Sequence, residues 1–204
     1  VEDTLLEEVR RHPGIAEAEA GDIVLAREKV GEDWIPLLLF VVDDFQAMRL
    51  NTFAHQSGAW PPPDGTMLIE RSAVQMLQAG EGDTVMVKTP NGRPRAVAVT
   101  GLVHDPGLAP AWQEREGYGY ITRATLAQLG EPPMLGELRV TVSERPFDLK
   151  AIEATTAELA QWLTARGHPV LQVRVPPPGR HPHQNQMMGV LFLMLAFSAM
   201  ALVL

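Results

Sequence analysis

The chain ends in an 18-residue segment, Met187 to Leu204, that contains no charged residue and no proline. At 1.5 Å per residue, a helix of this length spans roughly 27 Å, close to the ~30 Å hydrocarbon core of a bilayer. A buried helix of a soluble domain normally keeps a polar stripe, whereas a single serine interrupts this segment. We therefore predict that Met187 begins a transmembrane helix in contact with lipid, and we expect a few residues beyond Leu204 to complete the crossing. The alternative is a buried core helix.

Composition excludes several classes of function. The 204 residues are 46% hydrophobic and 21% charged, which is typical of a globular domain with a substantial core. The formal net charge of −8 argues against a surface that neutralises nucleic-acid phosphates. Cysteine is absent, which excludes disulfides, thiolate chemistry and cysteine-ligated zinc.

The residue pattern before the apolar segment predicts a mixture of helices and strands. Ser72 is the expected N-cap of one short helix, and residues 45–57 and 106–117 are expected to be irregular or loops, the first at most weakly helical. The predicted helices are Val1–His12, Ala73–Gln78, Thr122–Leu129 and Asp148–Gly167, and the predicted strands are Ile15–Val30, Trp34–Val42, Thr66–Glu70, Thr84–Lys88, Arg95–Val103, Tyr118–Ile121, Leu138–Val142 and Val170–Val175.

This order of elements predicts an α+β fold in which helices pack on a mixed sheet and a small β-rich lobe is inserted. Residues 1–44 and 118–175 are expected to form the membrane-proximal lobe. Residues 45–117 form the inserted lobe, because the Pro-rich loop after Trp60 marks a boundary. Residues 176–186 are a stiff polar connector, and residues 187–204 begin the transmembrane helix.

A glycine-aspartate pair precedes one of the predicted strands. Gly82 permits a positive φ, and the carboxylate of Asp83 can accept a hydrogen bond from a backbone N–H in the turn. We predict a structural role for Gly82 and Asp83.

No arrangement of residues predicts catalysis, a cofactor or a metal site. His181 and His183 form the one close histidine pair, but they stand in the connector without carboxylates nearby. The pairs His104–Asp105 and Asp43–Asp44 lie at strand ends, where adjacent side chains point to opposite faces. No serine lies in a G-x-S-x-G turn, and no glycine-rich loop follows a strand and opens a helix.

Trp60 and Trp112 lie in loops rich in proline. Such residues can form a contact surface for an apolar ligand or a partner protein. The alternative interpretation is packing between the two lobes.

Four segments together resemble a known family of membrane proteins. They are LLEEVRRHPGIAEAE (residues 5–19), LFVVDDFQAMRL (39–50), DGTMLIERSAVQMLQAGEGDTVMV (64–87) and VAVTGLVHDP (97–106). In order and spacing they are similar to the periplasmic core domain of MacB/FtsX-type ABC transporter permeases, which include the lipoprotein-release permeases. The chain departs from the family pattern at Val42, where glycine is usual.

The resemblance implies a non-catalytic domain on the periplasmic or extracellular side of the cell (inner) membrane. It implies a permease subunit with four membrane helices, working as a homodimer or heterodimer with a separate cytoplasmic ATPase. Motions driven by that ATPase would serve to export, extract or signal, with a possible extracytoplasmic protein partner. The alternatives are a single-span tethered binding or sensor module without an ATPase, and a membrane-anchored hydrolase.

Overall fold

The computed structural model describes residues 1–179 and 184–203, with some side chains of the last helix left out. The chain divides into two compact units, Val1–Glu144 and Arg145–Leu204. The first unit contains a mixed sheet of eight strands and several short helices, so the predicted α+β class is confirmed.

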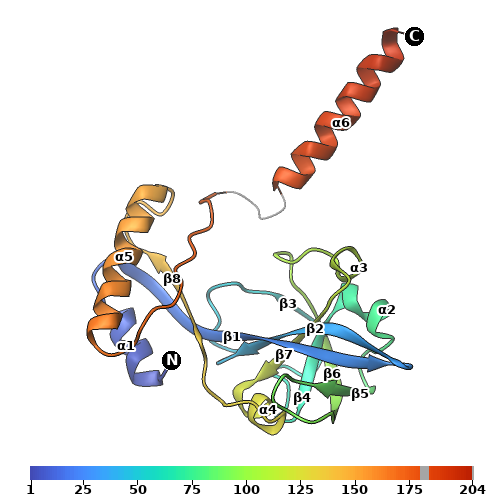
Figure 1. Ribbon diagram of the computed structural model, residues 1–204, viewed down its shortest axis with the longest axis horizontal. Helices are drawn as coiled ribbons and strands as arrows, with labels where there is room; N and C mark the ends of the chain where they lie inside the picture. Colours follow the sequence, from blue (N-terminus) through green and yellow to red (C-terminus); the bar gives the residue numbers. More distant parts are fainter. Residues whose placement is uncertain (180–183, 204) are drawn as a thin grey trace. The chain divides into compact units, whose positions relative to one another are not determined.

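Six of the eight strands close into a ring (Figure 1). Their order around the ring is β1-β2-β7-β4-β6-β5, and β5 returns to β1. The pairs β2–β7 and β4–β6 are parallel, and the other pairs are antiparallel. The strands are β1 (Ile15–Val30), β2 (Asp33–Val42), β3 (Ala54–Gly58), β4 (Thr66–Glu70), β5 (Thr84–Lys88), β6 (Arg95–His104), β7 (Gly117–Thr122) and β8 (Glu137–Val142).

Strand β1 is 16 residues long and serves two parts of the unit. Residues 15–21 pair with β8, and residues 21–30 pair with β2. Residues 27–29 also pair with β5 and thereby close the barrel. One continuous strand therefore joins the barrel to the β1–β8 extension.

The helices of the first unit are short. Helix α1 buries Leu5, Leu6 and Val9, and it ends just before Pro13, which cannot continue a helix. The other helices stand next to strand ends in the chain. The helices of the first unit are α1 (Asp3–Arg10), the 3₁₀ turn η1 (Arg71–Ala73), α2 (Val74–Leu77), α3 (Ala111–Glu114) and α4 (Arg123–Gln128).

The barrel interior is filled by inward-facing side chains of alternate strand positions. Leu37 and Leu39 of β2 and Met67 of β4 are fully buried there. Gly119 of β7 lies between them, and a Cβ at this position would come within 2.9 Å of Leu39 Cδ2. The lack of a side chain at Gly119 thus lets β7 pack closely against its neighbours.

The second unit contains helix α5 (Leu149–Ala165), a following extended segment and helix α6 (Gln184–Val203). Asp148 caps α5 by accepting hydrogen bonds from the backbone N–H groups of Lys150 and Ala151. The predicted strand Val170–Val175 is wrong: within the described part of the chain these residues pair with no strand, and Leu171 is 97% exposed. Alternation of apolar residues sets a strand's faces, but a strand also needs a neighbour to hydrogen-bond.

The predicted transmembrane segment corresponds to α6. In the part of the chain that the structure describes, no helix combines the length and the apolar character needed to cross a bilayer. Residues 180–183 of the connector and Leu204 lie outside the described residues.

Three local predictions are corrected. Residues 45–57, expected to lack a strand, contain most of β3, which pairs with β6 at the edge of the sheet. The loop 106–117 contains the helical turn α3. Ser72 is not an N-cap, because the Glu70 carboxylate accepts the hydrogen bond from the Ser72 N–H.

The predicted lobe boundaries at residues 44 and 118 stay a prediction. Strands on both sides of these boundaries hydrogen-bond in the same sheet, as in the β4–β7 and β1–β5 pairs.

Candidate interaction face of the barrel

Strand β1 reverses the usual distribution of polar and apolar side chains. Ala18, Ala20, Ala26 and Glu28 share the buried face. On the opposite face, Ile23 is 40% exposed and Leu25 is 68% exposed. A charged residue thus points into the barrel while two large aliphatic residues point out of it, which is opposite to the normal pattern of a half-buried strand.

The exposed side chains of β1 continue onto the neighbouring strands. Leu25 lies opposite Leu38 and Ile23 lies opposite Phe40, both on β2 and both only partly buried. Met86 of β5 is 38% exposed and lies opposite Lys29. Four of these residues are adjacent and form a partly exposed apolar strip, which we call the outer strip: Ile23, Leu25, Leu38 and Phe40. Met86 is separated from them by Arg27 and Lys88. Exposed apolar surface of this kind commonly marks a contact site.

Three exposed cations border one end of the outer strip. Arg27 of β1 lies directly opposite Lys88 of β5, and Lys29 follows two residues along. Among the described residues, these three side chains take part in no ion pair. Like charges opposite each other weaken a sheet, so this pair has no evident stabilising role.

Two carboxylates border the other end of the outer strip. Glu17 forms an ion pair with Arg49 at 3.0 Å. Glu19 accepts hydrogen bonds from the backbone N–H groups of Arg49 and Leu50, the latter at 3.0 Å. These contacts hold the loop after β2 against β1.

Glu28 lies inside the barrel beside the strip. It faces Ile35 of β2 on one side and Val87 of β5 on the other. It is fully buried, and neither carboxylate oxygen has a hydrogen-bond partner among the residues that the structure describes. Burial raises the pKa of Glu28 from its ordinary value of 4.5 to about 7, because removal from water disfavours the charged form.

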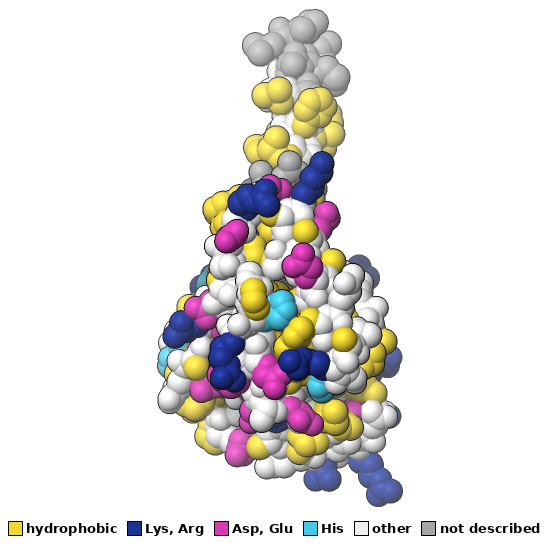
Figure 2. Space-filling model, turned by 90° about the vertical axis from the view of Figure 1, so that its left-hand side faces the viewer, with side chains coloured by type: hydrophobic (Ala, Val, Ile, Leu, Met, Phe, Trp, Pro, Cys, Tyr) yellow, Lys and Arg dark blue, Asp and Glu magenta, His cyan; other side chains and the backbone are white. Residues whose placement is uncertain are grey.

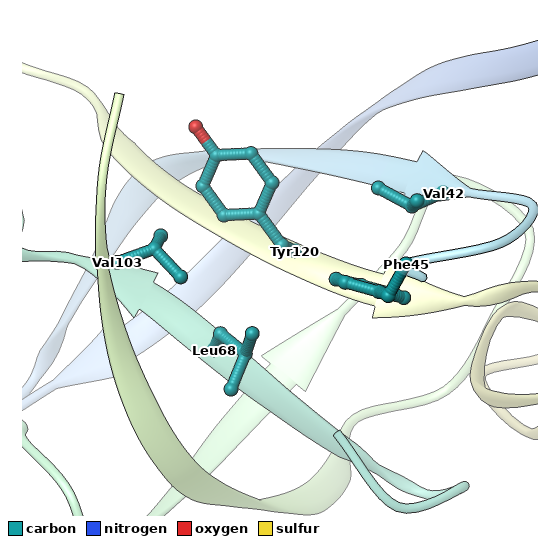
Figure 3. Close-up of a cluster of buried hydrophobic side chains, with 5 residues drawn as sticks. All are labelled: Val42, Phe45, Leu68, Val103 and Tyr120. Atoms are coloured by element: carbon teal, nitrogen blue, oxygen red, sulfur yellow. The ribbon is translucent and has the colours of Figure 1, made fainter. Parts of the chain in front are cut away.

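Trp60 packs against a second apolar cluster, which lies outside the barrel. The buried members of this cluster are Val42, Phe45, Leu68, Val103 and Tyr120 (Figure 3). The Trp60 ring packs edge-on against Phe45 at 5.4 Å and Phe53 at 5.7 Å between centroids. The loop after β2 thus folds over the sheet and is held by aromatic contacts.

Trp112, the other predicted contact residue, lies on α3 and is 70% exposed. It is not part of the Trp60 cluster as that cluster is defined here. Trp112 is thus exposed while Trp60 packs within the chain, and a contact role for either residue stays a prediction.

A polar network surrounds Glu70 at the end of β4. One carboxylate oxygen accepts from the Ser72 N–H at 2.6 Å and from the Ser72 hydroxyl. The other oxygen bonds His104 Nδ1 at 3.1 Å, and Arg71 donates to His104 Nε2 at 3.1 Å. Because an arginine can only donate, Nδ1 carries the imidazole proton. Ser72 Oγ in turn accepts from the Ala111 N–H, which fixes the start of α3.

The turn before β5 contains Gly82 and Asp83, for which the sequence predicts a structural role. Gly82 has a φ of 94°, which favours glycine, and the Asp83 carboxylate accepts from the Gly80 N–H at 2.8 Å. Backbone bonds from Gly82 to Val99 and from Val99 to Asp83 tie this turn to β6.

The residue pairs considered for catalysis hold other contacts. Asp105 accepts from the Tyr120 hydroxyl at 2.8 Å, and Asp43 pairs with Arg123. Asp44 caps the following turn by accepting from the Gln46 N–H. Over residues 1–179 and 184–203, no three or more His, Asp or Glu side chains gather where they could hold a metal ion. His181 and His183 lie outside the described residues.

Charges of both signs are interspersed on one side of the molecule. Figure 2 shows this face, where acidic and basic side chains alternate and no broad patch of a single sign forms. On this face nothing resembles a basic stripe for nucleic acid.

The outer strip and Glu28 were not singled out from the sequence. A usable signal was present: in the run Ile23 to Lys29, placing Ala26 inward forces Glu28 inward and Leu25 outward. Glu70 gave no such signal, because its partner His104 lies 34 residues away in the chain.

The fold is that of a MacB-like periplasmic core domain, as comparisons with solved structures show. The chain is similar to the periplasmic region of MacB from Actinobacillus actinomycetemcomitans, with 13% identity, a TM-score of 0.54, and coverage of 83% of this chain and 75% of that one. It is also similar to the extracellular domain of the noncanonic ABC-type transporter YknZ from Gram-positive bacteria. That match has 13% identity, a TM-score of 0.56, and coverage of 83% and 86%. No protein-family model and no curated protein sequence matches the chain.

Proposed function

We propose that the chain is the extracytoplasmic domain of an ABC transporter permease subunit. In this role it transmits motions driven by a separate cytoplasmic ATPase, to export, extract or signal at the outer face of the membrane. The shared fold with two extracytoplasmic domains of such transporters supports this general role. The residues described above favour contacts and mechanical links over chemistry.

The observation that carries the proposal is the way in which β1 connects the parts of the first unit. Helix α1 packs on the first half of β1, where Arg10 Nε donates to the Ala18 carbonyl at 3.0 Å. Strand β8, which leads toward α5 and the connector, pairs with the same half. The second half of β1 is a wall of the barrel. A displacement of either α1 or β8 is therefore delivered to a strand that continues unbroken into the barrel, as hinge-type transmission requires.

Helix α6 supports a membrane location for the proposed permease. The apolar side chains between Met188 and Phe197 that the structure describes are largely exposed. Such a surface is stable when lipid covers it. We place the barrel on the periplasmic or extracellular side of the cell (inner) membrane, in a permease homodimer or heterodimer.

An insertion in the connector tests the mechanical link. The full-length subunit, purified with its ATPase, receives a six-residue Gly/Ser insertion after Pro178. A spin label is placed on Trp112→Cys; these 204 residues contain no cysteine of their own, and any cysteine elsewhere in the subunit is first replaced by serine. Trapping the ATPase with ADP-vanadate is expected to shift the distance between the labels of two subunits, and the insertion should abolish the shift while ATP hydrolysis continues.

The matched control carries the same insertion at Gly31, in the exposed turn between β1 and β2. This turn lies beyond the barrel end of β1, so the shift should persist. If the connector insertion leaves the shift intact, the proposed transmission is wrong.

A tethered binding or sensor module without an ATPase is the second candidate. The exposure of Trp112 favours it, because a lone exposed tryptophan is suited to contact a ligand or partner. Absence of ATPase activity in the complex purified from its native membrane through a tag on this chain would select that candidate.

A further inference from the structure

The outward-facing side chains of β1 follow a symmetric order of charge. Taking every second residue gives two acids, a small residue, two aliphatic residues and two cations. These are Glu17, Glu19, Gly21, Ile23, Leu25, Arg27 and Lys29. If the order is reversed about Ile23, Glu19 faces Arg27 and Glu17 faces Lys29. From this we infer that the outer strip binds the outer strip of a second copy of the chain, about a two-fold axis close to Ile23.

The apolar centre of the outer strip supports such a contact. Ile23 and Leu25 are exposed on this face, and Leu38 and Phe40 extend the apolar surface on β2. A two-fold interface places the same patch on both sides, so the aliphatic side chains of one copy cover those of the other. The patch then buries its own counterpart and no third component is needed.

The charges at the two ends of the outer strip determine which partner can bind there. Arg27, Lys29 and Lys88 have no ion-pair partner among the described residues, so the cationic end calls for carboxylates. At the other end, Arg49 pairs with Glu17, while Arg139 of β8, which lies opposite Glu19, pairs with Glu137, so a net negative charge remains. An anionic lipid layer would satisfy the cations but repel this acidic end. A second copy in reversed orientation places Glu19 and Glu17 of one copy against Arg27 and Lys29 of the other.

The geometry is compatible with the length of the strand. Glu19 and Arg27 are eight residues apart, about 26 Å at the rise of an extended strand. Two antiparallel copies of this segment bring each acid opposite a cation only when the axis passes near Ile23. The register of the contact is thus defined by the sequence of β1.

This inference deepens the proposed function, since it names the surface by which two permease copies meet outside the membrane. Tethering in one membrane raises the effective concentration of the copies, so a weak contact suffices. The test measures association of β1 and not transport, so the two proposals can fail separately.

Cysteine cross-linking tests the two-fold axis. These 204 residues contain no cysteine, and any cysteine elsewhere in the full-length subunit is first replaced by serine, so single substitutions report one position each. In the full-length subunit in native membrane vesicles, Ile23→Cys is expected to form a disulfide-linked dimer rapidly, because a residue on the axis meets its own copy. Lys29→Cys alone should cross-link poorly, whereas Lys29→Cys mixed with Glu17→Cys should cross-link. Trp112→Cys, exposed but outside the outer strip, is the control.

Charge reversal tests the order of charges. Lys29→Glu and Glu17→Lys should each slow the Ile23→Cys cross-link at least tenfold, because like charges then meet. Mixing the two variants should restore the rate, since each reversed charge faces an opposite one. Both positions are on the surface, and circular dichroism checks that the variants fold.

Two results would overturn the inference. In one, Ile23→Cys cross-links no faster than Trp112→Cys, or the mixed charge variants fail to recover. In the other, a fluorophore on Leu25→Cys is quenched by brominated phosphatidylglycerol, which places lipid on the outer strip.

Discussion

Glu28 and Glu70 are both buried glutamates of the same sheet, but their surroundings differ. Glu70 lies outside the barrel at the end of β4, and both of its oxygens accept hydrogen bonds, from Ser72 and His104. Glu28 lies inside the barrel between Ile35 and Val87, and neither of its oxygens has a partner. Burial of a carboxylate is tolerated when hydrogen bonds replace the lost water, and it is costly when they do not.

The difference indicates what each residue does. Glu70 organises η1 and, through Ser72 and Ala111, the start of α3. It is a structural link between three elements. Glu28 organises nothing by hydrogen bonding, and it makes the barrel sensitive to pH. The two sites therefore predict opposite effects when the carboxylate is removed.

Removal of the Glu70 carboxylate has the largest expected effect. Glu70→Ala leaves the Ser72 N–H, the Ser72 hydroxyl and His104 Nδ1 without their acceptor. We expect a loss of about 4 kcal/mol in the free energy of unfolding, measured by urea denaturation. Glu70→Gln keeps the shape and one acceptor oxygen, so it should lose about half as much. Equal stability of Glu70→Ala and the wild type would contradict the assigned role.

Removal of the Glu28 charge should instead stabilise the protein at high pH. The pKa of Glu28 is raised to about 7 in the folded state, above its ordinary value of 4.5. The folded state therefore loses stability as the pH rises from 4.5 to 7, by as much as about 3 kcal/mol, and the loss is absent below 4.5. Glu28→Gln abolishes the charge, so it should remove this slope and be more stable than the wild type at pH 8.

Urea denaturation between pH 4 and pH 8 measures the slope. Glu32→Gln, a change at an exposed glutamate in the turn after β1, is the matched control and should retain the wild-type slope. A wild-type protein with the same stability at pH 5 and pH 8 would show that Glu28 is hydrated.

The sequence was sufficient for elements set by local pattern. The strands Thr66–Glu70 and Thr84–Lys88 and the long strand Ile15–Val30 are confirmed at the predicted bounds. Each begins directly after turn residues (Pro13–Gly14, Asp64–Gly65 and Gly82–Asp83), so short-range information sets its start. Helix α5 was found for the same reason, from its aspartate cap and its stripe of leucines.

Features that depend on distant partners were not predictable from the sequence. Closure of the barrel rests on the pairing of β1 with β5 and of β2 with β7, and neither pairing leaves a mark within a single strand. Strand β3 was missed because Ala54–Gly58 is polar and pairs only with β6 through a bulge. The predicted strand Val170–Val175 failed for the opposite reason, since its pattern has no partner strand. The surroundings of Trp60 could be interpreted only from its packing against Phe45 and Phe53, which the sequence does not reveal.

Ser72 tests whether the Glu70 network extends to α3. Ser72→Ala removes the hydroxyl that joins Glu70 to the Ala111 N–H. We expect a loss of about 1.5 kcal/mol in the free energy of unfolding and faster hydrogen exchange at the Ala111 amide. Ser57→Ala, which breaks an exposed bond to Glu81, is the control and should change both quantities less. Unchanged exchange at Ala111 would limit the network to β4 and η1.

A hydrogen-bond donor placed beside Glu28 gives the smallest expected effect and bears most directly on the comparison. Ile35 lies directly opposite Glu28, so Ile35→Thr brings a hydroxyl within reach of the orphaned carboxylate. A bond to the charged form lowers the pKa of Glu28, by on the order of half a unit, as measured by NMR titration of its carboxyl carbon. Ile35→Val, with a similar shape and no hydroxyl, should leave the pKa where it is. If the pKa of Glu28 is the same in both variants, the Glu28 carboxylate does not face β2. The lack of a hydrogen-bond donor on β2 then does not explain the difference between Glu28 and Glu70.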